Sequence, residues 1–162
     1  SLSRPPVVAP QPGSSENAPM KKTELQPLPK INADHVKTDY SGTSCVIVFD
    51  FQVFSFTNLS SEAITVLRAI SSQIKDSLTD YKLIIEGHTD TVPMSSAATV
   101  SDNYALGLSR ADKVFELLKK KFGMPADSMT ATSAGEKDPP FPNTDEALRR
   151  KNRTVVLKLV PK

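Results

Sequence analysis

Cysteine, histidine and tryptophan are scarce in this sequence, and their scarcity argues against several kinds of site. The 162 residues include one cysteine, two histidines and no tryptophan. A single cysteine cannot form a disulfide within the chain. Cys45 lies in an apolar run, where we expect a small buried core residue rather than a nucleophile. Two histidines and one cysteine without ligand spacing do not make a zinc site. We therefore expect no bound metal and no cofactor.

An excess of one charge and a long apolar run are missing as well. Lysine and arginine total 20 against 18 aspartate and glutamate residues, which gives a formal net charge of +2. This balance argues against a nucleic-acid partner, since proteins that bind a phosphate backbone carry a basic face or stripe. No segment approaches the roughly 20 apolar residues that cross a bilayer, and no signal-peptide pattern opens the chain. We expect any signal peptide or membrane anchor to lie outside this sequence.

Proline, by contrast, is concentrated near the N-terminus. Seven of the 13 prolines fall between Pro5 and Pro29, among polar residues without apolar periodicity. Such a stretch buries too little surface to offset the entropy lost on ordering, and its prolines favour extended conformations. We interpret residues 1–40 as a disordered, proline-rich tether and residues 41–162 as one folded domain. A disordered terminus without a tethering role is the alternative.

The remaining sequence alternates between strand-like and helix-like segments. Two stretches carry apolar residues at spacings of three and four, which indicates amphipathic helices. Four shorter stretches are rich in β-branched residues or alternate in polarity, which indicates strands. The order predicts an α/β sandwich, β-α-β-α-β-(α)-β, with the helices on one face of a mixed sheet. The expected elements are a strand at 43–50, a helix capped by Ser60 or Ser61 and ending near residue 78, a strand at 82–87, a helix at 104–122, a strand near 129–134, a short helix at 143–150 and a strand at 153–160.

Asp90 and Arg110 have the clearest potential for binding chemistry. Asp90 follows a strand that ends in Gly87, where α/β folds commonly place binding residues. Arg110 lies seven residues after Asn103, so the two side chains are about 20° apart on one helix face. If the helix starts beside the strand end, Asp90 and Arg110 complement a zwitterion. The carboxylate then binds an ammonium group, and the guanidinium binds a carboxylate in bidentate fashion. The residues alone leave a second interpretation open, in which Asp90 caps a loop and Arg110 lies on the helix surface.

Four sequence blocks resemble the signature of OmpA C-terminal-like peptidoglycan-binding domains, a family that includes Pal and the flagellar stator protein MotB. The family patterns read roughly G-H-T-D, N-x-x-L-S-x-x-R-A, G-E-x-x-P and N-R-R-V. All four blocks occur in this order over about residues 43–160, which is nearly the whole globular part. The corresponding stretches are Gly87-His88-Thr89-Asp90, Asn103 to Ala111, Gly135-Glu136-Lys137-Asp138-Pro139 and Asn152-Arg153-Thr154-Val155.

The resemblance implies both a fold and a ligand. It implies the OmpA C-terminal fold, and binding without catalysis to the peptide stem of peptidoglycan at its diaminopimelate residue. Asp90 would bind the amino group of that residue and Arg110 its carboxylate. Thr89 and Asn103 correspond to positions that line or shape the same pocket. The residues expected to support the site are Leu106, Asn152 and Arg153.

The chain departs from the family pattern at three places. Gly107 stands where the family usually has serine; a glycine weakens a helix by roughly 1 kcal/mol, or it permits a close approach. Thr154 replaces the second arginine of the N-R-R block and removes one polar contact. The loop between Asp90 and Asn103 is longer than in Pal-like domains and is closer to the MotB-like branch. These changes retain Asp90 and Arg110, so they put the affinity in question rather than the class of ligand.

The leading functional hypothesis is a cell-wall anchor for an envelope protein or machine. The resemblance implies the periplasm of a Gram-negative bacterium, tethering to the outer or inner membrane, and peptidoglycan and an envelope protein complex as partners. A homodimer is one possible state, since dimers occur in the MotB-like branch, and the sequence leaves the oligomeric state open. The alternative is a protein-interaction module of a secretion system or flagellar stator, with weak or absent wall binding. A third interpretation is an enzyme that acts on the wall. His88 lies close to Asp90, but no motif places a nucleophile beside it, so we expect no enzyme activity.

Overall fold

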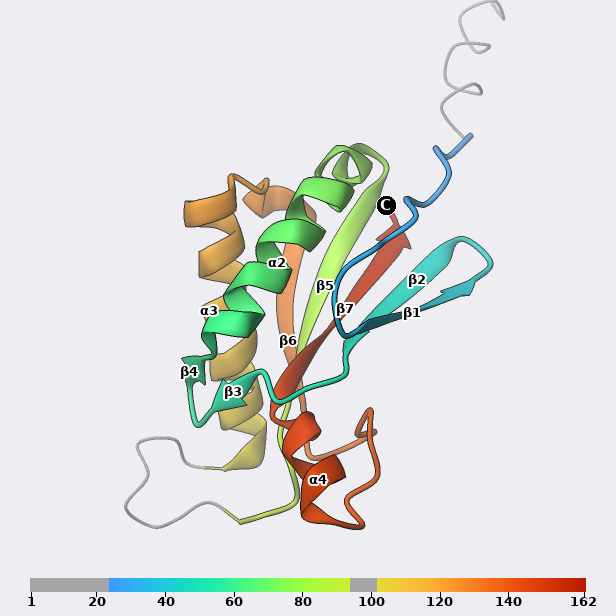
Figure 1. Cartoon of the computed structure of the whole chain (residues 1–162). Helices are drawn as coiled ribbons and strands as arrows, with labels where there is room; N and C mark the ends of the chain where they lie inside the picture. The colour runs from blue at the N-terminus through green and yellow to red at the C-terminus, as the bar shows by residue number, and fades with distance from the viewer. Residues whose placement is uncertain (1–23, 94–101) are drawn as a thin grey trace, which may run out of the picture.

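The computed structural model describes residues 24–93 and 102–162, and it confirms the predicted α/β sandwich. A five-stranded sheet forms one layer. Two long helices, α2 (Ser61–Ile74) and α3 (Asn103–Phe122), form the other layer on one face of the sheet (Figure 1). No helix in the described part of the chain is both long and apolar enough to span a membrane.

The sheet is mixed, as predicted. β5 and β6 run parallel and are connected through α3, whereas all other neighbouring strands are antiparallel. The last strand in the sequence, β7, lies in the middle of the sheet between β2 and β5. The five-stranded sheet is therefore complete only when this C-terminal strand has paired with both neighbours. In spatial order the strands are β1 (Val36–Ser41), β2 (Ser44–Phe49), β7 (Thr154–Pro161), β5 (Tyr81–His88) and β6 (Met129–Gly135).

Capping groups fix where the two long helices begin and end. The Ser60 side chain accepts a hydrogen bond from the backbone N–H of Ala63 at 3.1 Å, which caps α2. Asp102 caps α3 in the same way by accepting from the backbone N–H of Ala105 at 2.7 Å. The helix ends at Gly123, whose φ of 66° is a left-handed conformation that glycine adopts at little cost. The capping residue Asp102 therefore fixes the start of α3, which borders the site described below.

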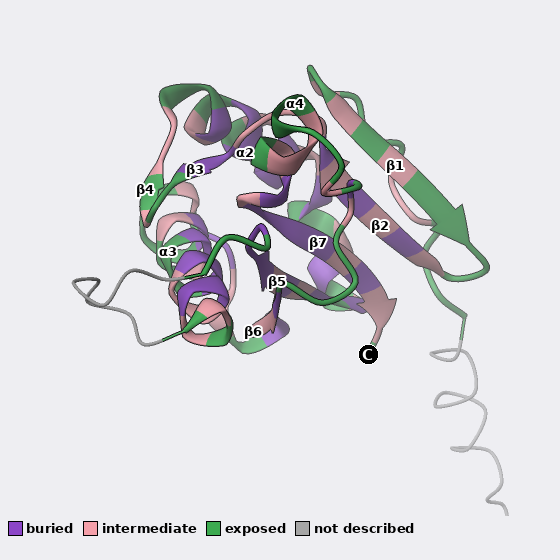
Figure 2. Ribbon diagram, turned by 90° about the horizontal axis from the view of Figure 1, so that it is seen from below, coloured by how far each residue is buried: buried purple, intermediate pink, exposed green. Residues whose placement is uncertain are grey.

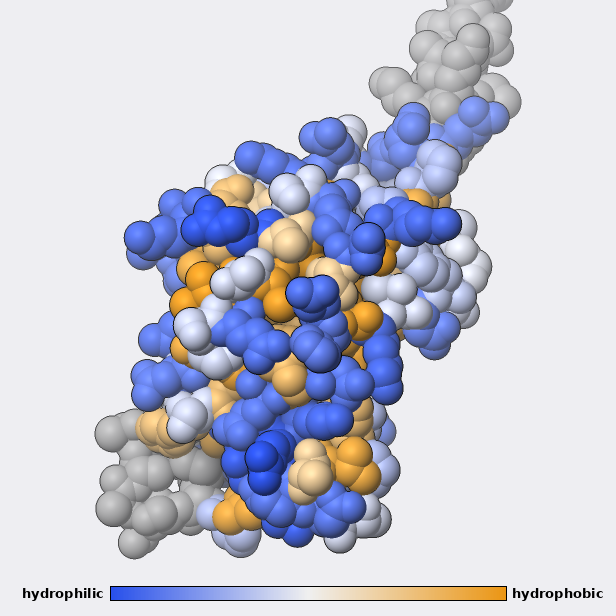
Figure 3. Space-filling view, in the orientation of Figure 1, coloured by the Kyte–Doolittle hydropathy of each residue, from blue (hydrophilic) through white to orange (hydrophobic). Residues whose placement is uncertain are grey.

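The core lies between the helices and one face of the sheet. Alternate residues of each central strand point toward the helices, as the two-residue period of a strand requires. In β7 these are Val155, Leu157 and Leu159, which are all buried. Cys45 of β2 is buried in the same layer, as predicted. Figure 2 shows the buried residues concentrated along the central strands and the inner sides of the helices. Most of the surface in Figure 3 is hydrophilic, with apolar residues scattered between polar ones.

Several short elements complete the fold. α2 continues into a 3-10 helix, η2 (Lys75–Thr79), and η3 (Ala126–Ser128) precedes β6. A small hairpin of β3 (Phe54–Ser55) and β4 (Asn58–Leu59) follows β2. α4 (Glu146–Arg149) and η4 (Arg150–Asn152) precede β7. The hairpin and α4 lie at the same end of the molecule as the last residues of β5 (Figure 1). Among the described residues, the strands that were not predicted are β1, β3 and β4, and the 3-10 helix η3 was not predicted either.

The predicted elements otherwise match the structure closely. The largest difference is the short helix expected at 143–150, because α4 begins at Glu146. Asp145 explains this boundary, since its side chain accepts a hydrogen bond from the backbone N–H of Leu148 at 2.9 Å and so acts as the N-cap. Tyr104, expected within the apolar stripe of α3, is exposed in the first turn of the helix.

The ordered region begins earlier than the sequence pattern predicted. Residues 1–40 were expected to form the tether, but β1 already pairs with β2 from Val36 onward. Ahead of it, residues 24–35 run along the domain as an extended segment, which we call the strap (Figure 1). Residues 1–23, the other part of the expected tether, lie outside the described residues. The high proline content favoured a disordered tether at this segment. No pattern indicated otherwise, because the apolar residues of the segment follow neither a helical nor a strand period. The strap residues that pack against the core are Leu28, Ile31 and Ala33.

Hydrogen bonds hold the strap along its length. The Gln73 side chain of α2 accepts from the backbone N–H of Asn32 at 2.7 Å and donates to its carbonyl at 2.8 Å, so it pairs with the strap as a neighbouring strand would. Further along, the Tyr81 hydroxyl donates to the carbonyl of Gln26 at 2.7 Å. The backbone N–H of Gln26 donates to Asp80 at 3.1 Å. These contacts extend the strap to the end of the sheet where β5 begins.

Candidate ligand-binding site

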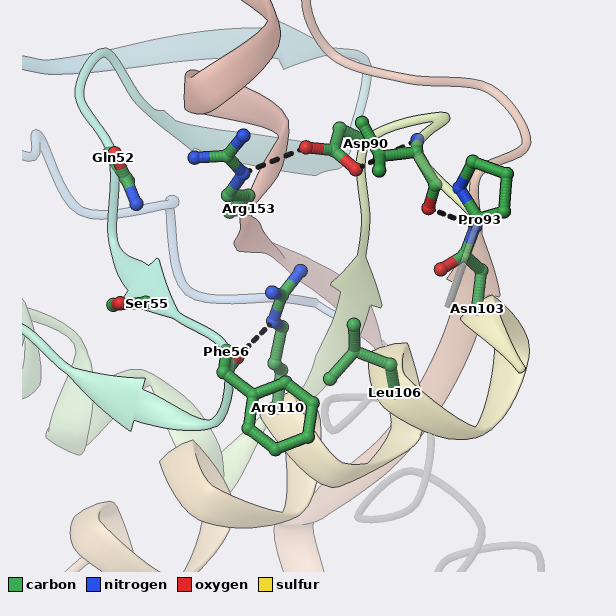
Figure 4. Close-up of a pocket in the computed structure, with 10 residues that line it drawn as sticks. Gln52, Ser55, Phe56, Asp90, Pro93, Asn103, Leu106, Arg110 and Arg153 are labelled. Carbon is green, nitrogen blue, oxygen red and sulfur yellow. Dashed lines mark hydrogen bonds and ion pairs between the residues drawn. The ribbon is translucent and has the colours of Figure 1, made fainter. Parts of the chain in front are cut away.

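A pocket of about 340 Å³ opens where β5 ends. Its walls come from the segment around β3, the loop after β5, the first turns of α3 and the residue before β7 (Figure 4). The structure thus brings together five of the seven residues that the sequence singled out: Asp90, Asn103, Leu106, Arg110 and Arg153. The other residues that line the pocket are Gln52, Ser55, Phe56, Val92 and Pro93.

Asp90 provides the carboxylate of the pocket. Its Oδ1 accepts a hydrogen bond from the backbone N–H of Val92 at 3.0 Å, and its Oδ2 accepts one from Nε of Arg153 at 2.8 Å. The residue is 7% exposed, so solvent screens its charge much less than it screens a surface aspartate. Asp90 therefore does cap the loop after β5, but it also presents a sheltered negative charge to the pocket.

Arg110 provides a guanidinium from α3 and is 2% exposed, so it is not a surface helix residue. Its Nε donates to the carbonyl of Phe56 and its Nη1 to the carbonyl of His88, both at 2.8 Å. The guanidinium carbon also lies 5.5 Å from the centre of the Phe54 ring. These contacts hold the side chain across the end of β5. Within the described residues these contacts use two of its five N–H donors, which leaves the Nη2 group for a ligand.

Arg153 adds a second guanidinium to the same pocket. Besides its bond to Asp90, its Nη2 lies 3.3 Å from Oε2 of Glu146 in α4. Burial lowers the pKa of Arg110 to about 10, while Asp90 acts to raise it and Arg153 acts to lower it. Arg110 therefore remains protonated at neutral pH. Two arginines against one aspartate leave the lining of the pocket with an excess of one positive charge.

Apolar side chains surround these charged groups. Leu106 is buried in the wall formed by α3, whereas Phe56 and Val92 are 41% and 50% exposed at the rim. Pockets of this kind commonly combine an apolar lining with a few polar groups that fix the orientation of the ligand. The arrangement suits a ligand with an ammonium group, a carboxylate and a short methylene chain.

Thr89 and Asn103 contribute to the site in different ways. Thr89 is buried, its hydroxyl donates to the carbonyl of Asp90 at 2.9 Å, and it does not line the pocket. Asn103 does line it, and its Nδ2 donates to the carbonyl of Val92 at 3.3 Å and to Glu136 at 3.0 Å. Thr89 thus orients the loop that carries Asp90, and Asn103 joins that loop to the start of α3.

Asn152 and Thr154 lie behind the pocket rather than in it. Asn152 is fully buried; it accepts from the backbone N–H of Phe141 at 3.0 Å and donates to the carbonyl of the same residue at 2.9 Å. It therefore holds the loop that precedes α4. Thr154 is also fully buried, and its hydroxyl donates to the carbonyl of Val155. Thr154, where the chain departs from the family pattern, is therefore not part of the pocket lining.

The hairpin side of the pocket was not predicted from the sequence. Gln52, Ser55 and Phe56 belong to no motif, and β3 and β4 are too short for a periodic pattern. Phe56 adopts a φ of 53°, which is uncommon for a residue other than glycine. A single aromatic residue in a polar turn gave no signal, because such residues are common on protein surfaces.

His88 lies outside the pocket lining. It is 1% exposed, and its Nε2 lies 2.8 Å from Oε1 of Glu86. Burial lowers the pKa of His88, although Glu86 acts to raise it. The histidine is thus a neutral, buried partner of Glu86 at neutral pH.

Comparison with known proteins shows the family to which this domain belongs. The model of the OmpA family matches residues 49–153, a range that contains every residue of the pocket lining. The chain belongs to the OmpA family. A curated relative, the peptidoglycan-associated lipoprotein of Pasteurella multocida, is 34% identical over 104 residues. That match covers 64% of this chain and 65% of the relative, so the chain spans slightly less than two thirds of that protein.

Solved structures of related domains share the fold of this OmpA-family domain. A MotB-like protein from Desulfovibrio vulgaris is 25% identical with a TM-score of 0.67, covering 78% of this chain and 79% of its own. The periplasmic domain of Helicobacter pylori MotB is 16% identical with a TM-score of 0.71, covering 85% and 89%. The cell wall anchor of the T6SS from Pseudomonas aeruginosa is 18% identical with a TM-score of 0.64, covering 94% and 99%.

Proposed function

We propose that this domain binds the peptide stem of peptidoglycan at its diaminopimelate residue and so holds an envelope protein or machine at the cell wall of the periplasm. The observation that carries the proposal is one small pocket with a sheltered carboxylate, Asp90, and a buried guanidinium, Arg110. The names of the relatives support it, since they include a peptidoglycan-associated lipoprotein and a cell wall anchor.

The chemistry of the pocket matches the free end of a diaminopimelate side chain. Asp90 would receive the ammonium group, and the Nη2 group of Arg110 would donate to the carboxylate. Leu106 and the exposed ring of Phe56 would contact the methylene groups between them. The proposed role is binding without catalysis. The bound peptide would fix the position of the envelope protein or machine to which this domain belongs.

Co-sedimentation with purified, insoluble peptidoglycan tests the proposal. The wild-type protein is expected to pellet with the wall, and Asp90→Ala is expected to abolish pelleting. Asp112→Ala is a suitable control, because this exposed residue of α3 is not part of the pocket lining. Undiminished pelleting of Asp90→Ala would place the binding site elsewhere.

Arg110 needs a more careful variant, because its side chain also supports the Phe56 and His88 carbonyls. Arg110→Lys keeps the charge but loses the planar donor group, and we expect at least about tenfold weaker binding. Thermal unfolding of the variant shows whether the fold is retained. A wild-type protein that ignores peptidoglycan but captures an envelope component would favour the protein-interaction alternative. Release of soluble muropeptides during incubation would indicate an enzyme instead.

A further inference from the structure

The carboxylate proposed to receive the ligand already has a cation as its partner. Arg153 Nε donates to Asp90 Oδ2 at 2.8 Å, and the two side chains are 26% and 10% exposed. An ammonium group that enters the pocket therefore meets a carboxylate whose charge is balanced. In Figure 4, Arg153 lies directly beside Asp90 at one side of the pocket. Binding of an amine at Asp90 has to compete with this resident guanidinium.

Arg153 also has a second, looser contact. Its Nη2 lies 3.3 Å from Oε2 of Glu146, whose side chain is 50% exposed. Arg149 contacts the other oxygen of the same glutamate at 2.8 Å. Glu146 is thus a partner that can retain Arg153 at the edge of the pocket when the bond to Asp90 is broken.

Arg110 cannot supply all the donors that a ligand carboxylate can accept. A carboxylate offers about four acceptor sites, whereas two of the donors of Arg110 are directed at the carbonyls of Phe56 and His88. Figure 4 shows the free end of the Arg110 guanidinium directed toward the part of the pocket beside Arg153. A ligand carboxylate at this place would have guanidinium groups on two sides.

We propose that Arg153 exchanges partners when the ligand binds. The ammonium group of the ligand replaces Arg153 at Asp90, and the carboxylate of the ligand receives Arg153 together with Arg110. This inference rests on the proposed function, and it adds a selection rule to it. A simple amine exchanges the Asp90–Arg153 pair for its own pair with Asp90 and offers the displaced Arg153 no carboxylate, whereas a zwitterion forms a pair at Asp90 and also supplies a carboxylate that receives Arg153. Arg153 is therefore the residue that makes the pocket select a zwitterion over an amine.

Two stem peptides that differ in one group test the exchange. Both contain diaminopimelate; the first has the free ammonium and carboxylate groups, and the second has that carboxylate converted to an amide. Calorimetry with the wild-type protein is expected to show at least about tenfold weaker binding of the amide. In Arg153→Ala the ratio between the two peptides is expected to fall to about threefold or less. The amide itself is expected to bind Arg153→Ala at least as tightly as it binds the wild type, because the competing cation is gone.

Two further variants separate this role from a structural one. Arg153→Lys retains the charge and is expected to restore part of the preference for the free carboxylate. Arg149→Ala removes the neighbouring arginine, which contacts Glu146 but does not line the pocket, and is expected to behave as the wild type does. Equal amide penalties in the wild type and Arg153→Ala would overturn the exchange while leaving the proposed function intact. A wild-type protein that binds neither peptide would overturn the proposed function itself, and the exchange with it.

The resident pair can also be tested without any ligand. A double-mutant cycle with Asp90→Asn and Arg153→Ala, followed by urea unfolding, measures how strongly the two residues interact. The exchange requires the two substitutions to be clearly non-additive. Additive effects would overturn it, whatever the protein binds.

Discussion

Gly87 and Gly107 allow the backbone of α3 to lie directly against β5. A Cβ atom at Gly87 would overlap the carbonyl oxygen of Gly107, and a Cβ atom at Gly107 would overlap Ser133 Oγ and lie 2.9 Å from the carbonyl oxygen of Gly87. Gly107, where the family usually has serine, therefore serves a close approach of helix and strand. The contact matters for the site because it sets the distance between the helix that carries Arg110 and the strand that leads to Asp90.

Substitutions at the two glycines are expected to differ in cost. Gly87→Ala forces two backbones apart, and we expect it to lower the free energy of unfolding by about 3 kcal/mol or more. Gly107→Ala gains helix propensity, but its Cβ would displace the Ser133 hydroxyl from its bonds to Tyr104 and Gly135 and press on the Gly87 carbonyl oxygen. Its net cost is expected to be smaller than that of Gly87→Ala, about 1–2 kcal/mol. Urea unfolding of both variants checks the order. A Gly87→Ala protein as stable as the wild type would contradict the close approach.

His88 is expected to make the domain sensitive to mild acid. Its lowered pKa arises first from burial, opposed by Glu86 and Asp138 and assisted by Lys158. Below about pH 6.5 the histidine of the unfolded chain takes up a proton, whereas the folded histidine does so only at lower pH. The unfolded state then binds more protons, so stability falls as the pH falls, by up to about 1.4 kcal/mol per unit.

Urea unfolding of the wild type and His88→Gln at pH 7.5, 6.0 and 5.0 checks this expectation. The loss of stability between pH 7.5 and 5.0 should be smaller in the variant. Glu86 adds a second dependence at lower pH. Burial acts to raise the pKa of Glu86, but hydrogen bonds from His88 and Lys158 outweigh it and lower the pKa, so this contribution is lost as the pH falls below about 4.5. Parallel pH profiles for the two proteins would exclude His88 as the source.

At the scale of whole elements, the strap is the part of the fold that depends most on a few polar contacts. Gln73 makes two hydrogen bonds with the backbone of Asn32. Gln73→Ala is expected to lower the free energy of unfolding by about 1 kcal/mol and to speed hydrogen exchange in residues 24–35. Ser72→Ala is the matched control, since the Ser72 hydroxyl donates to the carbonyl of Ala69 within its own helix. Unchanged exchange in the strap of Gln73→Ala would show that apolar packing alone holds it.

The sequence predicted an element correctly where a periodic pattern extends over many residues or where a capping residue marks its boundary. The extent of α3 and its end at Gly123 match the structure, and Ser60 is the N-cap of the two serines predicted, although Tyr104 of the predicted stripe is exposed. The strap and the β3–β4 hairpin were not predicted, because each is held by tertiary contacts that leave no periodic pattern. The contacts of the site likewise include some that the sequence predicts and some that depend on tertiary structure. Motif spacing brought Asp90 and Arg110 together, but the bond between Asp90 and Arg153 depends on how two loops meet in space.

At the scale of the whole molecule, the strap and the C-terminus occupy one end, and the pocket occupies the other (Figure 1). The backbone N–H of Lys162 donates to the carbonyl of Asp80 just before β5 begins, and Gln26 of the strap contacts the same aspartate. Asp90 follows the opposite end of β5. The place where the described chain enters the domain therefore lies at one end of β5, and the proposed ligand site lies at the other end.

Chains that begin at different positions test how much of the N-terminal segment belongs to the domain. A chain that begins at Glu24 keeps the whole strap, whereas one that begins at Val36 keeps β1 and loses the strap. We expect the shorter chain to unfold at a clearly lower temperature, because it exposes the core surface that Leu28 and Ile31 cover. Equal melting temperatures would show that the strap rests on a surface that is stable without it.

The direction of the strap has a mechanical consequence. If the wall holds the pocket and a load pulls on the chain at Glu24, the force runs lengthwise through the domain from one end to the other. The strap lies nearly along that line, so its bonds to Gln73 and Tyr81 and its buried side chains are sheared together rather than peeled one after another. A contact that shares its load resists more force than one that opens step by step. The arrangement is therefore suited to a part that works under tension.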